Sequence, residues 1–277
     1  MLTIAQITDL HVTTGDDPLN QLRNEQRLRQ VLRNIHALSP RPAAIIASGD
    51  LVDNGHPDEY AELKTILADC EIPIYFGIGN HDRRAPFLDA FGGPGAPTDE
   101  HGYVQYAVDF PGLRMVVCDT LEEGKDKSGF DRERAAWLAR TLDQDTETPT
   151  IVVMHHPPIT SGVKWMDPDP NAPWIGWLAE AIEGRKQIRA VLCGHVHRAF
   201  HGLLAGQVVA TAPATSIQVT LDLSDIDLDR PDGREILVAE PPGYVLVVAD
   251  GGRVTTHTCI AGDFEPAVAY TRPFSLD

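Results

Sequence analysis

The stretch LTIAQITDLH, residues Leu2–His11, decides the fold class. Its first six residues are mostly apolar or β-branched, which is typical of a buried strand, and they lead directly to Asp9 and His11. Two side chains separated by one residue lie on the same side of extended backbone. The stretch therefore predicts a strand that brings an acid and an imidazole to one place.

Four further apolar segments follow the same plan, because each ends in Asp, Asn or His. Glycine precedes the polar residue in three of them, where it lets the chain turn sharply. Ligand sites of α/β proteins collect at the carboxyl ends of strands, so we expect the polar residues to meet at one edge. The segments are Ala43–Ser48 before Gly49-Asp50, Ile72–Ile78 before Gly79-Asn80-His81-Asp82, Thr150–Met154 before His155-His156, and Ile188–Cys193 before Gly194-His195-Val196-His197.

Amphipathic helical patterns alternate with these segments and indicate an α/β protein. Leu28, Val31, Leu32 and Ile35 repeat at the three- and four-residue spacing of a helix. The remaining predicted elements are helices over Pro57–Cys70, Asp131–Asp143 and Ala172–Glu183, and a hairpin over Val104–Phe110 and Leu113–Asp119.

The pattern changes after residue 205, where strands follow one another without helices. The predicted strands are Gln207–Ala212, Ser216–Leu221, Gly243–Ala249 and Arg253–Cys259, with an acidic loop over Asp222–Glu240. We therefore predict an α/β core over residues 1–205 and a β-rich C-terminal extension over residues 206–277. The extension is expected to pack on the core and to be available for contact with a second subunit.

Composition excludes several classes of protein. The 277 residues include 23 Lys and Arg against 40 Asp and Glu, and a formal charge of −17 argues against a nucleic-acid polymer as partner. The apolar runs are far shorter than the ~18–20 residues that span a bilayer, and the first residues lack the basic start of a signal peptide. We expect a cytoplasmic protein without membrane contact, whose four cysteines are reduced.

The polar residues after the strands are nitrogen and oxygen donors. A structural zinc site is not expected because no cysteine set accompanies them, whereas Fe, Mn, Zn or Co in a reactive site fits these donors. One tetrahedral site needs three or four ligands, and two metal ions that share a carboxylate use more. The seven candidate ligands are Asp9, His11, Asp50, Asn80, His155, His195 and His197.

The ordered blocks D-x-H, G-D, G-N-H-D, a lone His and G-H-x-H resemble the calcineurin-like metallophosphoesterase superfamily. They span Asp9 to His197, and the His155-His156-Pro157-Pro158 form resembles the bacterial branch that includes class III cyclic-nucleotide phosphodiesterases and glycerophosphodiesterases. The resemblance implies a four-layer αββα sandwich, two β-sheets flanked by helices, with a dinuclear site of divalent or mixed-valence metal ions at the strand ends.

Roles for individual residues follow from the same resemblance. It implies that Asp50 bridges two metal ions, of which one is held by Asp9, His11 and His197 and the other by Asn80, His155 and His195. His81 then faces the substrate phosphate as general acid or transition-state stabiliser, and Asp82 orients it. The residues expected to contact substrate are Asn80, His81, His156 and Arg83; for His156, support behind the site or simple packing is also open.

The expected activity is hydrolysis of small phosphodiesters, such as 3′,5′-cAMP or glycerophosphodiesters, by a metal-activated hydroxide. The Ser/Thr protein phosphatases of the superfamily carry two arginines that grip a monoester dianion, and Asn54 and Ile78 stand at those places here. Arg83 and Arg84 could replace them, so a phosphomonoesterase or a nucleotide pyrophosphatase remains an alternative, as does a non-catalytic metal-binding scaffold. The aromatic segment Thr160–Trp177 is either a lid or a packing element, and we expect a homo-oligomer.

Overall fold

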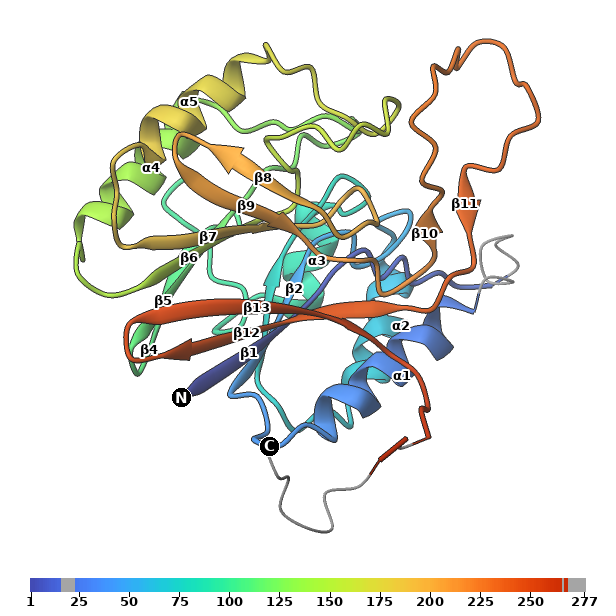
Figure 1. Ribbon diagram of the computed structural model, residues 1–277, viewed down its shortest axis with the longest axis horizontal. Helices are drawn as coiled ribbons and strands as arrows, with labels where there is room; N and C mark the ends of the chain where they lie inside the picture. The colour runs from blue at the N-terminus through green and yellow to red at the C-terminus, as the bar shows by residue number, and fades with distance from the viewer. Residues whose placement is uncertain (16–22, 266, 269–277) are drawn as a thin grey trace, which may run out of the picture.

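Two β-sheets lie face to face, and helices cover the outer side of each (Figure 1). The computed structural model describes residues 1–15, 23–265, 267 and 268. Within them strand and helix alternate as far as Cys193, except that the strands Tyr106–Phe110 and Leu113–Cys118 follow each other as the predicted hairpin. The helix Arg84–Phe91 is one that the sequence pattern does not predict.

The first sheet has the strand order β13-β12-β1-β2-β3. Strands β1, β2 and β3 run parallel, while β12 pairs antiparallel with β1 and with β13. The register places Ile4 beside Ala44 of β2 and Val247 of β12, so β1 is buried between an early and a late part of the chain. The bounds are β1 Leu2–Ile7, β2 Ala44–Ser48, β3 Ile74–Gly77, β12 Gly243–Asp250 and β13 Arg253–Ile260.

The second sheet has the order β4-β5-β6-β7-β9-β8. Its four central strands are parallel, and the edge strands β4 and β8 are antiparallel to their neighbours. The bounds are β4 Tyr106–Phe110, β5 Leu113–Cys118, β6 Thr150–Met154, β7 Ile188–Cys193, β8 His201–Leu204 and β9 Gln207–Thr211.

The helices pack on the outer faces of the two sheets. The first three pack with the first sheet, and α4 and α5 pack with the second. The side chains of α1 that the spacing predicts to face the core are buried, among them Leu28 and Ile35. Asp131 begins α4 by accepting a hydrogen bond from the main-chain nitrogen of Arg134 at 2.9 Å. The bounds are α1 Asn24–His36, α2 Pro57–Leu67, α3 Arg84–Phe91, α4 Arg132–Asp143 and α5 Pro173–Ile182.

Neighbouring side chains of the central strands point alternately into two separate cores, which gives the fold four layers. On β6, Ile151 and Val153 join the core between the two sheets, whereas Val152 and Met154 join the core beneath α4 and α5. Successive side chains of a strand point to opposite faces, so this split places one sheet between the other sheet and a helical layer. The predicted α/β fold class with two sheets and flanking helices is confirmed.

The residues after position 205 contribute to both sheets. The predicted boundary lies between β8 and β9, which pair as a hairpin, while β12 and β13 complete the first sheet. The strand predicted over Ser216–Leu221 is only β10, Gln218–Val219, and the predicted acidic loop contains β11, Leu237–Val238. Residue 266 and residues 269–277 of the predicted extension lie outside the described residues.

Two expectations concern the environment of the chain. Across the described ranges, every helix is too short or too polar to cross a lipid bilayer. All four cysteines are free thiols.

Candidate metal centre

The seven predicted ligands meet at one edge of the sandwich. They follow β1, β2 and β3 of the first sheet and β6 and β7 of the second, whose carboxyl ends point to the same edge. Six of the seven are at most 8% exposed, and His195 is partly buried. Both sheets therefore supply donors to one buried cluster.

The backbone at this edge adopts a conformation that side chains other than glycine rarely take. Positive φ angles occur at Asp9 (52°), His11 (44°), Asp50 (48°), His195 (71°) and His197 (53°). Left-handed backbone at a non-glycine residue costs free energy and persists where the surrounding structure enforces it, most often at functional sites. Five of the seven candidate ligands are held in this way.

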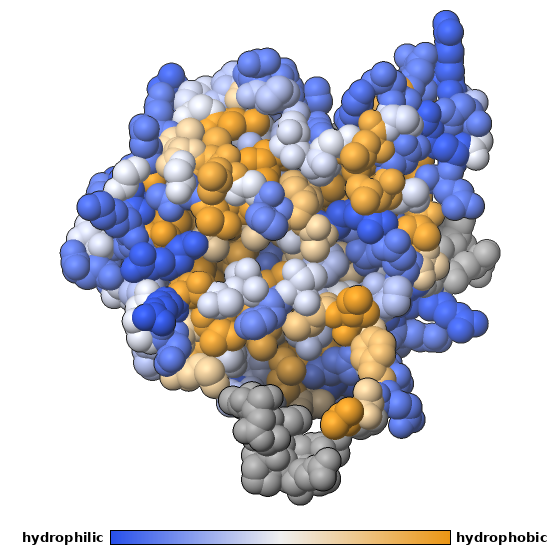
Figure 2. Space-filling model, in the orientation of Figure 1, coloured by the Kyte–Doolittle hydropathy of each residue, from blue (hydrophilic) through white to orange (hydrophobic). Residues whose placement is uncertain are grey.

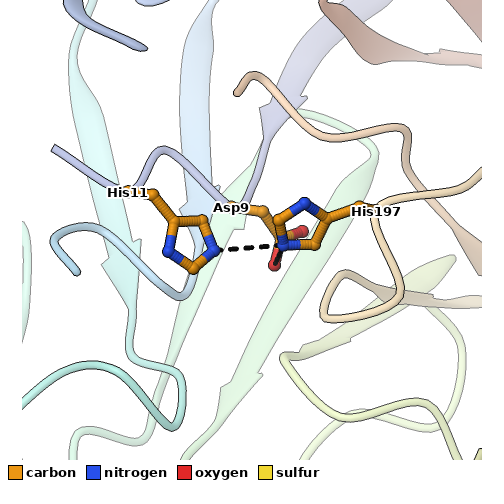
Figure 3. Close-up of side chains that lie close together, drawn as sticks. All are labelled: Asp9, His11 and His197. Atoms are coloured by element: carbon orange, nitrogen blue, oxygen red, sulfur yellow. Dashed lines mark hydrogen bonds and ion pairs between the residues drawn. The ribbon is translucent and has the colours of Figure 1, made fainter. Parts of the chain in front are cut away.

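The first group of donors consists of Asp9, His11 and His197 (Figure 3). The Nε2 atoms of His11 and His197 are 3.1 Å apart, and Nε2 of His197 is 3.5 Å from Oδ1 of Asp9. The outer ring nitrogens are bonded elsewhere: Nδ1 of His197 donates to the carbonyl of Ile217 at 2.7 Å, and Nδ1 of His11 is 2.8 Å from Asp53. In neutral rings of this tautomer both Nε2 lone pairs converge, an arrangement that a cation stabilises.

The second group consists of Asp50, His155 and His195 with the amide of Asn80. Nε2 of His155 is 3.2 Å from Oδ2 of Asp50 and 3.2 Å from Oδ1 of Asn80. The same amide oxygen is 3.0 Å from Nδ1 of His195. Nδ1 of His155 donates to the carbonyl of Ser48 at 3.1 Å, which again leaves Nε2 directed into the cluster.

Asp50 lies between the two groups. Its Oδ2 is 3.7 Å from Nε2 of His11 and 3.2 Å from Nε2 of His155, and its Oδ1 accepts a hydrogen bond from the main-chain nitrogen of His81 at 2.9 Å. A carboxylate in this position can contribute an oxygen to each of two metal ions. The grouping is the one that the sequence motifs imply.

The charged groups of the cluster shift one another's pKa values. Burial would raise the pKa of Asp50, but His155, His81 and His11 outweigh burial and hold this pKa well below its usual range. Burial would lower the pKa of His155, yet Asp50 raises it to about 9. Burial and then the charge of His155 lower the pKa of His195 to about 3. The cluster therefore places an ionised carboxylate beside one imidazole whose pKa is raised, His155, and one whose pKa is lowered, His195.

Two glycines are required by the close approach of the strands. A Cβ atom at Gly49, whose φ is +111°, would lie 2.4 Å from Nδ1 of His155. A Cβ atom at Gly79 would lie 2.3 Å from Oδ1 of Asp50. The glycine before each donor thus leaves the space in which the neighbouring donor sits.

The donor set fits a pair of transition-metal ions. It offers imidazole, carboxylate and amide oxygen, and the outer nitrogens of three imidazoles are held by a carbonyl or carboxylate, as in metal-ligating histidines. These contacts are Asp53 for His11, Ser48 for His155 and Ile217 for His197.

His81 lies beside the cluster and lines the adjoining cavity. Its Nδ1 donates to the main-chain carbonyl of Asp53 at 2.7 Å, and the Asp53 carboxylate is 3.5 Å away. Asp53 therefore holds both His11 and His81. The motifs do not point to Asp53, although it lies only three residues after Asp50 and directly before Asn54.

The predicted contact between Asp82 and the ring of His81 differs from the described geometry. The buried carboxylate of Asp82 accepts hydrogen bonds from the main chain of Gly79 (2.9 Å) and Leu51 (3.3 Å) and from the Tyr60 hydroxyl (3.0 Å). Burial, reinforced by Asp50, raises its pKa to about 6. Asp82 thus binds the two turns that carry Asp50 and Asn80, on the side away from the ring of His81. Asp53, and not Asp82, lies beside that ring.

The two arginines after this turn are engaged within the protein. Nη1 of Arg83 donates to the carbonyls of Asn80 (3.2 Å) and Asp82 (2.7 Å). Arg84 makes two hydrogen bonds of 2.8 Å to the buried carboxylate of Asp119. Arg83 thus binds the loop that carries Asn80 and His81, and its contact with substrate stays a prediction.

His156 is buried behind the cluster and touches the cavity. Its Nδ1 is 2.8 Å from the Thr120 hydroxyl, and its ring centroid is 4.7 Å from that of His195. Burial, together with His195 and His155, lowers its pKa well below the usual value. A neutral ring that supports His195 agrees with the supporting role left open by the sequence.

A cavity of about 960 Å³ opens above the donors. His11, Asp50, Asn80, His81, His195 and His197 form part of its wall. The segment 160–177 contributes Trp165, Met166 and Trp174, and Trp174 is at the same time buried in the core beneath α4 and α5. This segment therefore shapes the cavity and also packs against the body of the protein.

A four-layer αββα sandwich with buried Asp, Asn and His donors shared by both sheets defines a class, the dinuclear metallohydrolases. The chain matches the sequence model of the calcineurin-like phosphoesterases over residues 2–199 and belongs to that family. Enzymes of this family use a dinuclear metal centre. The predicted family and the predicted enzyme class, a metal-dependent phosphodiester hydrolase, are confirmed.

Individual relatives extend the comparison beyond the family. The chain is 30% identical to a probable glycerophosphodiester phosphodiesterase GpdQ of Arcobacter nitrofigilis over 95% of both chains. It is 27% identical to the 3′,5′-cyclic adenosine monophosphate phosphodiesterase CpdA of Pseudomonas aeruginosa, over 91% of this chain and 88% of the other. The fold is similar to that of a dimetal phosphatase from Danio rerio, with a TM-score of 0.67, 14% identity, and coverage of 94% and 99% of the two chains.

Proposed function

We propose that this protein hydrolyses small phosphodiesters, cyclic nucleotides or glycerophosphodiesters, at a pair of metal ions. The observation that carries the proposal is the position of Asp50, whose carboxylate faces His11 on one side and His155 on the other at the wall of one cavity. The names of the relatives point to the same two substrate types.

A diester is favoured over a monoester by the charge around the cavity. Arg83 and Arg84, the arginines that could grip a monoester dianion, are bonded to loop carbonyls and to Asp119. Among the described residues that line the cavity, Lys127 is the one lysine or arginine, and it is exposed. A singly charged diester needs less cationic help than a dianion.

The protein's own groups would divide the work as follows. Asp9, His11 and His197 would hold one metal ion, Asn80, His155 and His195 would hold the other, and Asp50 would contribute an oxygen to each. A pair of Fe, Mn, Zn or Co ions, when bound, would supply an acidified water and offset charge on the phosphoryl oxygens. His81, with Nδ1 bonded to the Asp53 carbonyl, presents Nε2 to the departing alkoxide and gives it a proton. Asn80 and the neutral His156 border the phosphate.

The test compares bis(p-nitrophenyl) phosphate with p-nitrophenyl phosphate. The protein is stripped of metal with a chelator and assayed before and after addition of Mn²⁺, Zn²⁺ or Fe²⁺. We expect activity to depend on added metal and to favour the diester. Preference for the monoester would assign a phosphomonoesterase, and a lack of activity with metal bound would favour the scaffold alternative.

A matched pair of variants tests the bridging role. Asp50→Asn should lower the bound metal and abolish most activity, because an amide has one oxygen donor and no charge. Asp109→Asn, on β4 with its side chain 77% exposed, changes the same chemical group away from the cluster and should leave metal content and rate unchanged. Equal metal content in both variants would contradict the assignment of Asp50.

The oligomeric state forms a separate part of the proposal. We propose a homo-oligomer, because β13 forms an edge of the first sheet and exposes Ile260, with Phe264 exposed close by. Exposed edges and apolar side chains are the surfaces by which chains associate. Sedimentation velocity over a range of concentrations measures the state directly, and a single monomeric species at all concentrations would contradict the proposal.

A further inference from the structure

An arm formed by β10 and β11 projects from the body of the protein (Figure 1). Its ladder contains only two residue pairs, Gln218 with Val238 and Val219 with Leu237. An isolated two-stranded ribbon is at best marginally stable in water. Contacts with the rest of the protein therefore set the position of the arm: Lys164 of the segment 160–177 pairs with Asp225 of the arm, and further contacts lie at its base.

Arg198 holds both legs of the arm at that base. Its Nε donates to the carbonyl of Val219 on the first leg at 2.5 Å, and its Nη1 and Nη2 are 2.9 and 3.1 Å from the carboxylate of Glu240 on the second leg. Such a two-pronged guanidinium contact fixes orientation as well as distance. The side chain of Arg198 is 21% exposed, so the contact is partly shielded from water.

The arm forms one wall of the cavity above the donors. Val219 and Leu237 stand opposite each other in the ladder, so their side chains share a face. Both line the cavity, together with Trp165 from the segment 160–177. A notch beside the arm is visible at the surface (Figure 2). The position of the arm thus decides how much apolar space lies next to the phosphate site.

The same short turn also carries a candidate metal ligand. His197 donates from Nδ1 to the carbonyl of Ile217, two residues before the carbonyl that Arg198 binds. Two adjacent residues, His197 and Arg198, therefore bind two alternate carbonyls, those of Ile217 and Val219. The inner contact orients an imidazole, and the outer contact orients the wall.

We propose that Arg198 is a positioning residue that determines substrate specificity. It holds the arm so that Val219, Leu237 and Trp165 bound an apolar slot for the alcohol group that stays on phosphorus during hydrolysis. The enzyme consequently prefers diesters in which this alcohol is large and carries a ring that can stack in the slot over those in which it is small. The inference rests on the proposed phosphodiesterase function and adds the part of the chain that selects among diesters.

Two substrates with the same leaving group separate specificity from chemistry. Methyl p-nitrophenyl phosphate and the p-nitrophenyl ester of thymidine 5′-phosphate both release nitrophenolate, and they differ in the alcohol that remains. We expect Arg198→Ala to lower kcat/KM for the thymidine ester about tenfold more than for the methyl ester, chiefly through KM, which is the usual size of apolar discrimination. Arg198→Lys, which keeps the charge but not the fork, should lie between.

Arg230→Ala is the matched control, since Arg230 lies in the arm, 86% exposed, and pairs only with the nearby Asp227 in the described contacts. It should leave both rates within about twofold, as exposed substitutions usually do. Metal content should be the same in the parent and in all three variants. Equal losses of kcat/KM on the two esters in Arg198→Ala, or no loss on either, would overturn the proposal.

Hydrogen exchange tests the arm independently of catalysis. Arg198→Ala should speed exchange of the amides of residues 217–220 and 236–240, while β7 and β9 keep their protection. Unchanged exchange in the arm would also overturn the proposal. If the parent hydrolyses neither ester, the proposed function fails, whereas the exchange experiment still decides whether Arg198 sets the position of the arm.

Discussion

At the scale of single residues, the candidate centre is built from imidazoles that are fixed at their outer nitrogens. Asp53 and the carbonyls of Ser48 and Ile217 hold three of the rings. The meeting of the seven candidate donors could be predicted, because each of their motifs directly follows the end of one of five strands. Asp53 and the true contacts of Asp82 could not, since the direction of each side chain depends on the turn that carries it.

His81 provides the most direct test of the proposed chemistry. His81→Ala should lower kcat about a hundred- to ten-thousandfold for a diester with an alkyl leaving group, the usual contribution of a positioned general acid. The loss should be far smaller for a nitrophenyl diester, whose leaving group departs without a proton. Steady-state kinetics on both substrates measures the difference.

The control for this experiment is His101→Ala, which removes an exposed imidazole whose described contacts are with Glu100 and Glu133. Its rates should equal those of the parent. Equal losses in His81→Ala on the two diesters would show that His81 orients substrate and does not supply the proton.

Metal uptake should depend on pH through His155. Asp50 raises the pKa of this ring to about 9 in the metal-free protein, so the ring carries a proton at neutral pH that a metal ion must displace. Raising the pH toward that value removes the competing proton. The affinity of the chelated protein for Mn²⁺ should therefore increase by up to about tenfold per pH unit.

Isothermal titration calorimetry in buffers of different ionisation enthalpy counts the protons released. Affinity that stays constant with pH, without proton release, would mean that His155 is already neutral or does not bind the metal.

At the scale of elements, the sequence predicts the buried strands better than the short edge elements. Strands β1, β6 and β7 have the predicted bounds because their apolar runs end abruptly at the donor motifs. Helix α3 was missed because it has only eight residues and contains Pro86, and β8 because it has four residues including Gly202. Short elements of this kind depend on tertiary contacts that no local pattern records.

The N-terminus of α4 allows an element to be tested alone. Asp131→Ala removes the carboxylate that accepts the Arg134 main-chain hydrogen bond and should lower the free energy of unfolding by about 1 kcal/mol. Urea unfolding of the parent and of the variant measures this difference in free energy. Asp131→Asn should retain most of the stability.

The effect of Asp131→Ala has a definite pH dependence. Burial opposes ionisation, but the Arg134 main chain and guanidinium outweigh it and lower the pKa of Asp131 below its usual 3.8. A carboxyl whose pKa is lower in the folded state stabilises at pH values above the unfolded pKa and loses this contribution as the pH falls through the folded pKa. The difference between parent and variant should narrow on acidification, and a difference that grows would contradict the cap.

At the scale of the whole molecule, the candidate centre joins two sheets that also meet through their apolar faces and through hydrogen bonds such as that of Tyr106 on β4 to Phe76 on β3. Donors follow three strands of the first sheet and two of the second. The sequence predicts that these ends meet, because parallel strands of α/β proteins share an edge. It does not predict that the late strands β12 and β13 join the first sheet, since strand order depends on packing between distant segments.

Removal of metal should therefore lower the stability of the entire molecule. A ligand that binds only the folded state, present at a hundred times its Kd, contributes about 2.7 kcal/mol, which corresponds to a fall in Tm on the order of 5–10 °C when it is removed. Differential scanning calorimetry with and without chelator measures the shift. Asp50→Asn should show little further change with chelator, and a parent Tm that is insensitive to chelation would argue against metal ions that cross-link the sheets.

The pairing of β1 with β12 has a consequence for synthesis on the ribosome. Strand β1 leaves the exit tunnel well before β12, yet β12, residues 243–250, is one of its two neighbours in the sheet. Until those residues emerge, the nascent chain carries an apolar strand with one unpaired edge, and such edges recruit other chains. Slow translation of the segment before β12, or a stop codon within it, would expose that edge to aggregation or to chaperones.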